Sequence, residues 1–206
     1  MCRLVARSVA GGLALGMCFP ASAHLVSTRF GELYSGFLHP LTSMQHLVPW
    51  LGLALLGGLL GARVAKWVLA VFPVAVVAGA LAAPGLAAVE QPMAVINLAS
   101  MMILGLIAAI APSLPRWSFL SLGAVLGFSH GFANANLGLA GYAQGLYALG
   151  VGLASYLLIT LALALCDLLV ERYRWGRTAA RACGSWVLAI GLVFAGFTLI
   201  GDGLPL

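Results

Sequence analysis

The histidines are the residues of this chain with the clearest capacity for chemistry. The sequence holds four of them, at positions 24, 39, 46 and 130. Histidine is the commonest metal ligand in proteins, and its charge changes near neutral pH. Other ionisable side chains are scarce, because only 7% of the residues are charged. Metal binding is therefore the chemistry that these residue types indicate first.

The stretch from His39 to His46 reads HPLTSMQH. Pro40 favours a helix start, with His39 at or before the cap. On a straight helix the two histidines would share a face about 10 Å apart, which is long for chelating one ion. The sequence allows either two successive binding positions for an ion or one site closed by a bend at Pro40. Oxygen atoms of Gln45 and Thr42 lie nearby in the sequence. The structural alternative is that His39 caps the helix and His46 hydrogen-bonds a neighbouring helix.

A second polar motif, SHGFANAN, starts at Ser129. His130 and Asn134 are four residues apart and so share a helical face. Gly131 permits a close backbone approach, and Asn136 adds a further polar group. A hydrogen-bond network between helices and the wall of a cation path would both explain this pattern. Asn97, alone in another apolar segment, could join such a path or bond a backbone carbonyl.

The composition defines the elements that must position these side chains. Hydrophobic residues make up 63% of the chain and mean hydropathy is +1.09, whereas soluble domains carry about 25% charged residues. This excludes a soluble domain, and the net charge of +5 is spread over short loops rather than forming a nucleic-acid surface. We expect an all-α, polytopic membrane helix bundle with six transmembrane helices. The apolar segments cover residues 43–60, 67–83, 92–111, 117–133, 145–166 and 182–201.

Residues 1–23 have the pattern of a cleavable signal peptide. Two arginines precede a short apolar stretch, and Ala-Ser-Ala at 21–23 forms a cleavage site. Cleavage would leave residues 24–206 as a single six-helix membrane domain. His24 would then be the first mature residue, with a free α-amine beside its imidazole. The alternative is an uncleaved anchor helix.

The loop charges predict the orientation of the chain in the membrane. If export places His24 outside, the outer loops hold only Arg29 among the lysines and arginines. Inner loops are cation-rich, which is the pattern of the positive-inside rule. The inner cations are Arg63, Lys66, Arg116, Arg172, Arg174, Arg177 and Arg181. We therefore expect a bacterial inner-membrane protein with periplasmic termini and all four histidines on the periplasmic side.

Together these features resemble the HupE/UreJ family of hydrogenase and urease accessory proteins, regarded as nickel permeases. The resemblance covers nearly the whole chain, including an HPxxGxDH motif in the first segment and an HGxAHGxE motif in the fourth. The chain keeps the motif residues His24, His39, Pro40, His46, His130, Gly131 and Ala133. The resemblance implies that His24, His39, His46 and His130 bind metal, with Gln45, Asn134 and Asn136 as secondary polar ligands.

The chain departs from both family motifs. The first motif's Gly and Asp are Ser43 and Gln45 here. The second motif's His, Gly and Glu are Asn134, Ala135 and Leu137. Two carboxylates and one imidazole are therefore missing from the expected path. Neutral His, Asn and Gln can still bind a borderline ion such as Ni²⁺, Co²⁺, Cu²⁺ or Zn²⁺.

The function expected from this pattern is that of a secondary transporter importing a transition-metal dication. The resemblance favours nickel or cobalt as the transported ion. The candidate ligands themselves do not indicate which dication is transported. The expected partners are the bilayer and the ion, with no permanently bound cofactor. The alternative is a non-transporting membrane subunit or assembly factor of a metalloenzyme complex, and a channel for another small solute also remains open. No GxSxG or HExxH motif is present, so we do not expect an enzyme.

Overall fold

A computed structural model describes residues 24–200 of the chain. The signal peptide predicted for residues 1–23 lies outside the described residues. The described part is all-helical and contains no strand. Its helices are α2 (His24–Leu38), α3 (Met44–Leu60), α4 (Ala62–Ala65), α5 (Val68–Ala82), α6 (Glu90–Ile110), α7 (Arg116–Ala133), α8 (Gly141–Arg172) and α9 (Gly176–Ile200), with short 3-10 turns at Pro40–Thr42, Ala83–Gly85 and Ala87–Val89.

Each of the six predicted apolar segments falls on a helix, namely α3, α5, α6, α7, α8 or α9. Within the described residues, four helical stretches are long and apolar enough to cross a membrane, and a bent pair formed by the end of α2 with α3 would make a fifth. The helix α7 is not among them. It has 18 residues, with an arginine at its first position and a histidine in its last turn. The fold is thus that of a membrane protein with four or five candidate spans, and six spans stay a prediction.

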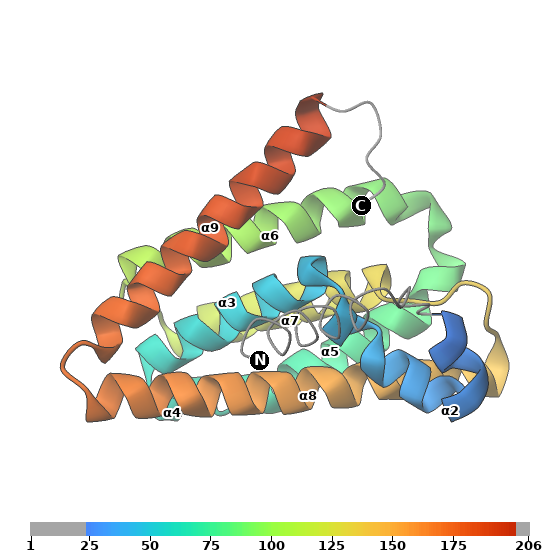
Figure 1. The fold of residues 1–206 in the computed structure, drawn as a ribbon, viewed down its shortest axis with the longest axis horizontal. Helices are drawn as coiled ribbons and strands as arrows, with labels where there is room; N and C mark the ends of the chain where they lie inside the picture. The colour runs from blue at the N-terminus through green and yellow to red at the C-terminus, as the bar shows by residue number, and fades with distance from the viewer. Residues whose placement is uncertain (1–23, 201–206) are drawn as a thin grey trace, which may run out of the picture.

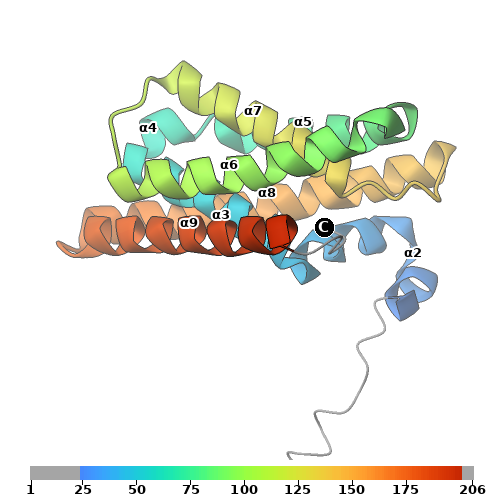
Figure 2. The same cartoon turned by 90° about the horizontal axis from the view of Figure 1, so that it is seen from above.

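The central element of the bundle is α3 (Figure 1). It lies between α8 on one side and α6 with α9 on the other, and eleven of its 17 residues are buried. Figure 2 shows α6 running between α7 and α9, while α5 packs mainly against α7 and α8. The helix α2 packs against α8. Other helices therefore surround α3 and its residue His46.

The connection between α2 and α3 is sharply bent. The last part of α2 together with the turn Pro40–Thr42 makes an angle of 76° with α3. The break falls at Ser43, whose backbone is extended (φ −112°, ψ 116°). His39 precedes the turn but makes no side-chain capping hydrogen bond. The chain therefore does bend between the two histidines, but the bend lies after the proline turn rather than at Pro40.

Two glycines allow α5 and α7 to pack in close contact. A Cβ atom added to Gly131 would overlap the carbonyl oxygen of Val76 on α5. In the same way, a Cβ on Gly79 would overlap the carbonyl oxygen of Phe128 on α7. Small residues are the usual means by which membrane helices approach closely. This seam fixes the end of α7 that carries His130.

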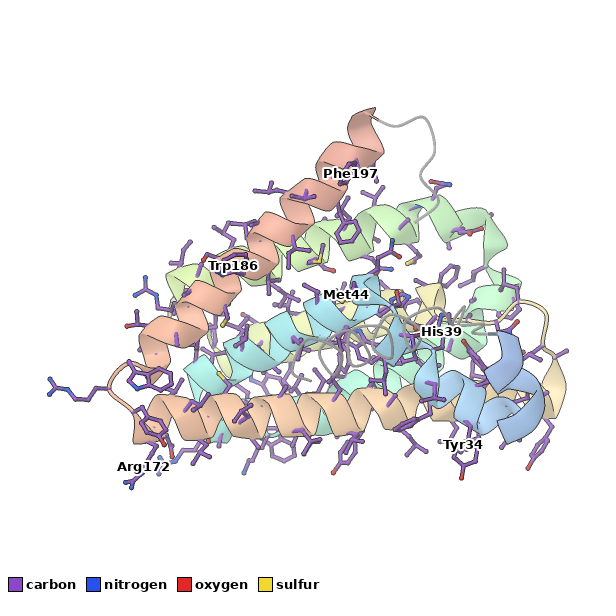
Figure 3. The ribbon with its side chains drawn as sticks, viewed as in Figure 1. Tyr34, His39, Met44, Arg172, Trp186 and Phe197 are labelled. Carbon is purple, nitrogen blue, oxygen red and sulfur yellow. The ribbon has the colours of Figure 1, made fainter. Side chains whose placement is uncertain are left out.

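Arg172 and His39 lie towards opposite ends of the bundle (Figure 3). Arg177 donates hydrogen bonds to the carbonyls of Leu59 and Ala111, at 3.2 and 3.4 Å. Arg181 donates from Nε to a carbonyl near the end of α6, at 2.8 Å. Carbonyls at helix C-termini lack partners within the helix. The basic start of α9 therefore also fastens α9 to the ends of α3 and α6.

Candidate functional site

A cavity of about 330 Å³ lies at the histidine end of the bundle. Its walls come from the bent connection before α3 and from α3, α6, α7 and α9. The polar side of the lining consists of His39, Ser43, Gln45, His46, Asn97 and His130. The remaining lining is apolar and includes the thioether of Met101. Polar groups from distant parts of the sequence thus converge on one space inside a largely apolar bundle.

Three imidazoles form a row along this cavity. The ring centroids of His39 and His46 are 6.0 Å apart, and those of His46 and His130 are 5.7 Å apart. A straight helix would separate His39 from His46 by about 10 Å, so the 76° bend draws them together. The Nδ1 atoms of His46 and His130 lie 3.5 Å apart. Both of these rings are buried, with 8% and 1% of their residue surface exposed.

His130 is held from several sides. The residue after it, Gly131, lies against α5 at the close seam described above. The amide Nδ2 of Asn134 donates to the backbone carbonyl of His130 at 2.7 Å. The Nε2 atom of His130 is buried and has no hydrogen-bond partner among the described residues. The ring is therefore fixed with Nδ1 facing His46 and with one nitrogen left for a further partner.

The secondary polar residues predicted from the sequence divide into two groups. Gln45 lines the cavity beside the histidines. Asn134 is fully buried, but it bonds its own helix and is not part of the lining. Asn136 is exposed, and its Oδ1 accepts a hydrogen bond from the Gly138 amide at 3.0 Å, as asparagines do in turns. His24 begins α2, and its side chain lies outside the described part of the chain.

Two further residues belong to the site. Asn97 of α6 lines the cavity and also donates from Nδ2 to the carbonyl of Ser129 at 3.2 Å, which is the backbone bond suggested by its sequence position. Tyr147 of α8 is buried next to the cavity lining, with its ring centroid 6.1 Å from that of His39. Asn97 stands out in the sequence as a lone amide among apolar residues. No comparable sequence signal connects Tyr147 with His39.

The polar groups that line the cavity are imidazoles, amides and a hydroxyl. Among the side chains that the structure describes, no group of three or more His, Cys, Asp or Glu could hold a metal ion. The described lining of the cavity also contains no carboxylate. The His46 and His130 Nδ1 atoms are 3.5 Å apart, and a cation between them would need oxygen ligands from amides or water. Such a set suits a borderline dication better than a hard one.

Comparison with known proteins identifies the family of the chain. The model of the family described as "HupE / UreJ protein" matches residues 13–194, which include both histidine motifs. No curated protein and no solved structure matches the chain. Because the matched region covers well over half of the sequence, the chain belongs to the HupE/UreJ family.

Proposed function

We propose that this chain is a membrane transporter, not an enzyme, and that it imports a transition-metal dication. Its family is associated with nickel or cobalt transport and with accessory roles for metalloenzymes, which favours Ni²⁺ or Co²⁺ as the substrate. We further propose six spans in the bacterial inner membrane, with the histidine end periplasmic and the arginine end cytoplasmic. The placement of His39 and Arg172 towards opposite ends of the bundle supports this orientation.

The pairing of His46 with His130 carries the proposal. Two imidazole nitrogens bound to one ion at 2.0–2.1 Å in tetrahedral geometry lie about 3.4 Å apart. The two Nδ1 atoms are 3.5 Å apart, so they could bind one ion with little movement. They come from two different helices, α3 and α7, and the two histidines are 84 positions apart in the sequence. A hydrogen bond between the two neutral rings would also place them at this distance, and the proposed ion would replace that bond.

The row of rings suggests how an ion would enter. His39 stands next to His46 at 6.0 Å between centroids, so it serves as an outer station rather than as a member of the inner pair. His24 would capture the ion first, at the periplasmic terminus. Without a carboxylate the ion is held loosely, which favours release. The membrane potential contributes about 4.6 kcal/mol per 100 mV for a dication, enough to drive accumulation inside.

The alternative is a non-transporting relative that serves as a subunit or assembly factor of a metalloenzyme complex. One observation favours it, namely the absence of any carboxylate from the described lining of the cavity. Burying a dication among neutral groups costs more than burying it beside opposite charge. In this alternative the histidines would only link helices, and their loss would affect stability or partner binding rather than ion movement.

Uptake of metal by cells expressing the protein separates the two functions. Ni²⁺, Co²⁺, Cu²⁺ and Zn²⁺ are compared, with His46→Ala and His130→Ala as test variants and Asn136→Ala as the matched polar control outside the cavity. We expect one ion to accumulate, both histidine variants to abolish its uptake at unchanged protein level, and the control to retain it. Absence of uptake of all four ions, with folded protein in the membrane, would favour the non-transporting alternative.

A further inference from the structure

Asn97 is the one polar side chain that α6 contributes to the histidine cavity. It lies on a helix that carries neither of the two histidine motifs. It shares the cavity with His46 and His130, and Met101 lies one turn further along the same face of α6. Because Asn97 is on a third helix, it would allow α6 to add a ligand to those that α3 and α7 provide.

The orientation of the Asn97 amide is fixed by its neighbour. A backbone carbonyl can only accept a hydrogen bond, so the atom that faces Ser129 O at 3.2 Å must be the Nδ2 donor. The other amide atom is therefore the oxygen. This Oδ1 is buried and has no hydrogen-bond partner among the described residues. Buried polar atoms in native proteins nearly always have a partner, so we expect a water or an ion to partner this oxygen.

We infer that Asn97 Oδ1 is a third ligand of the dication held by His46 and His130. This inference rests on the proposed transport function and names the ligand set of the same site. The hydrogen bond to Ser129, the residue before His130, couples the position of the amide to that of the histidine ring. The site then combines two neutral imidazoles and one amide oxygen. This combination suits borderline dications and leaves the full double charge uncompensated, so binding is weak and reversible.

Two substitutions distinguish the role of the Asn97 oxygen from the role of its NH₂ group. Asn97→Leu removes both, whereas Asn97→Asp keeps an oxygen donor, adds charge and loses the hydrogen bond to Ser129. Binding of Co²⁺ alone is measured on the purified full chain in lipid nanodiscs. The visible absorption of Co²⁺ reports a change of ligand set, and thermal unfolding reports folding. Asn136→Leu is the matched control, since Asn136 is exposed and outside the cavity.

We expect Asn97→Leu to weaken Co²⁺ binding by at least about tenfold and to change the visible absorption spectrum of the bound Co²⁺. A loss of about tenfold is typical even when a residue that only hydrogen-bonds a metal ligand is removed. Asn97→Asp should bind at least as tightly as the unaltered chain. Equal affinity and spectrum for Asn97→Leu and the unaltered chain would overturn the inference alone. Equal weakening by both substitutions would also overturn it, because the bond to Ser129 would then be what matters. No Co²⁺ binding by the folded, unaltered chain would overturn the proposed function as well.

Discussion

Replacement of Gly131 by alanine tests whether the seam between α5 and α7 positions the site. The added Cβ would overlap the carbonyl oxygen of Val76 and lie 2.7 Å from the Val76 Cα atom. Ordinary van der Waals contact begins at 3.4 Å. The two helices must therefore separate locally by at least about 0.7 Å, the difference between these distances, because backbone atoms cannot turn aside as side chains can.

This displacement has two expected consequences. Overpacking of this kind costs about 1–3 kcal/mol, which lowers the melting temperature of a chain this size by roughly 2–12 °C. His130 directly precedes Gly131, so its ring moves with the helix. The 3.5 Å separation of the His46 and His130 Nδ1 atoms then changes by a comparable distance. We therefore expect Gly131→Ala to reduce both stability and metal uptake.

Thermal unfolding of the purified protein in detergent measures the first effect, and uptake into cells measures the second. Gly145→Ala is the matched control, because a Cβ at Gly145 of α8 would meet nothing within 4 Å. Alanine is a better helix former than glycine by up to about 1 kcal/mol, so this control should be neutral or slightly stabilising. If Gly131→Ala behaves like Gly145→Ala in both assays, the account of the seam is wrong.

Three further predictions concern the rest of the bundle. Trp50→Ala should destabilise the protein by about 3–5 kcal/mol in thermal unfolding, because Trp50 is fully buried. Trp186→Ala should cost less than about 0.5 kcal/mol, because 71% of Trp186 is exposed. Equal effects of the two substitutions would contradict the assignment of Trp50 to the core. Arg177→Met should cost about 1.5–3 kcal/mol by leaving the carbonyls that end α3 and α6 without their donor. Arg174→Met, in the connection just before α9, is the comparison. With six spans, an impermeant maleimide should label Tyr142→Cys on intact cells and Arg174→Cys only after lysis, and labelling of both on intact cells would refute this topology.

Much of the helical framework could be predicted from the sequence. Each apolar segment falls on a helix, because long apolar runs in a chain with few charges have no other stable form in a membrane. The pairing of the helices could not be predicted in this way. Segments such as α5 and α8 are apolar on all sides, so periodicity does not show which face meets which neighbour. Trp50 shows the same limit, since it lies near the middle of α3 and is buried against Phe72 of α5, a contact that the sequence pattern does not show.

The candidate site was predictable in its residue types but not in its geometry. The histidine motifs identified His39, His46 and His130, and the structure brings these three side chains to one cavity. The spacing within HPLTSMQH could not show that the chain breaks at Ser43. The contact between His46 and His130 depends on tertiary packing across 84 residues. Asn136, five residues before the start of α8, accepts a hydrogen bond within a turn instead, because α7 ends before reaching it.

The most direct test of the central claim is Ni²⁺ and Co²⁺ entry into sealed vesicles that contain only the purified protein. A metal-sensitive dye inside the vesicles reports influx under an imposed, inside-negative potential. The account predicts influx through the unaltered chain and through Asn136→Ala, and its loss in His46→Ala and His130→Ala. Influx that persists in both histidine variants, or that is absent from vesicles holding the folded unaltered protein, would contradict transport through the His46–His130 pair.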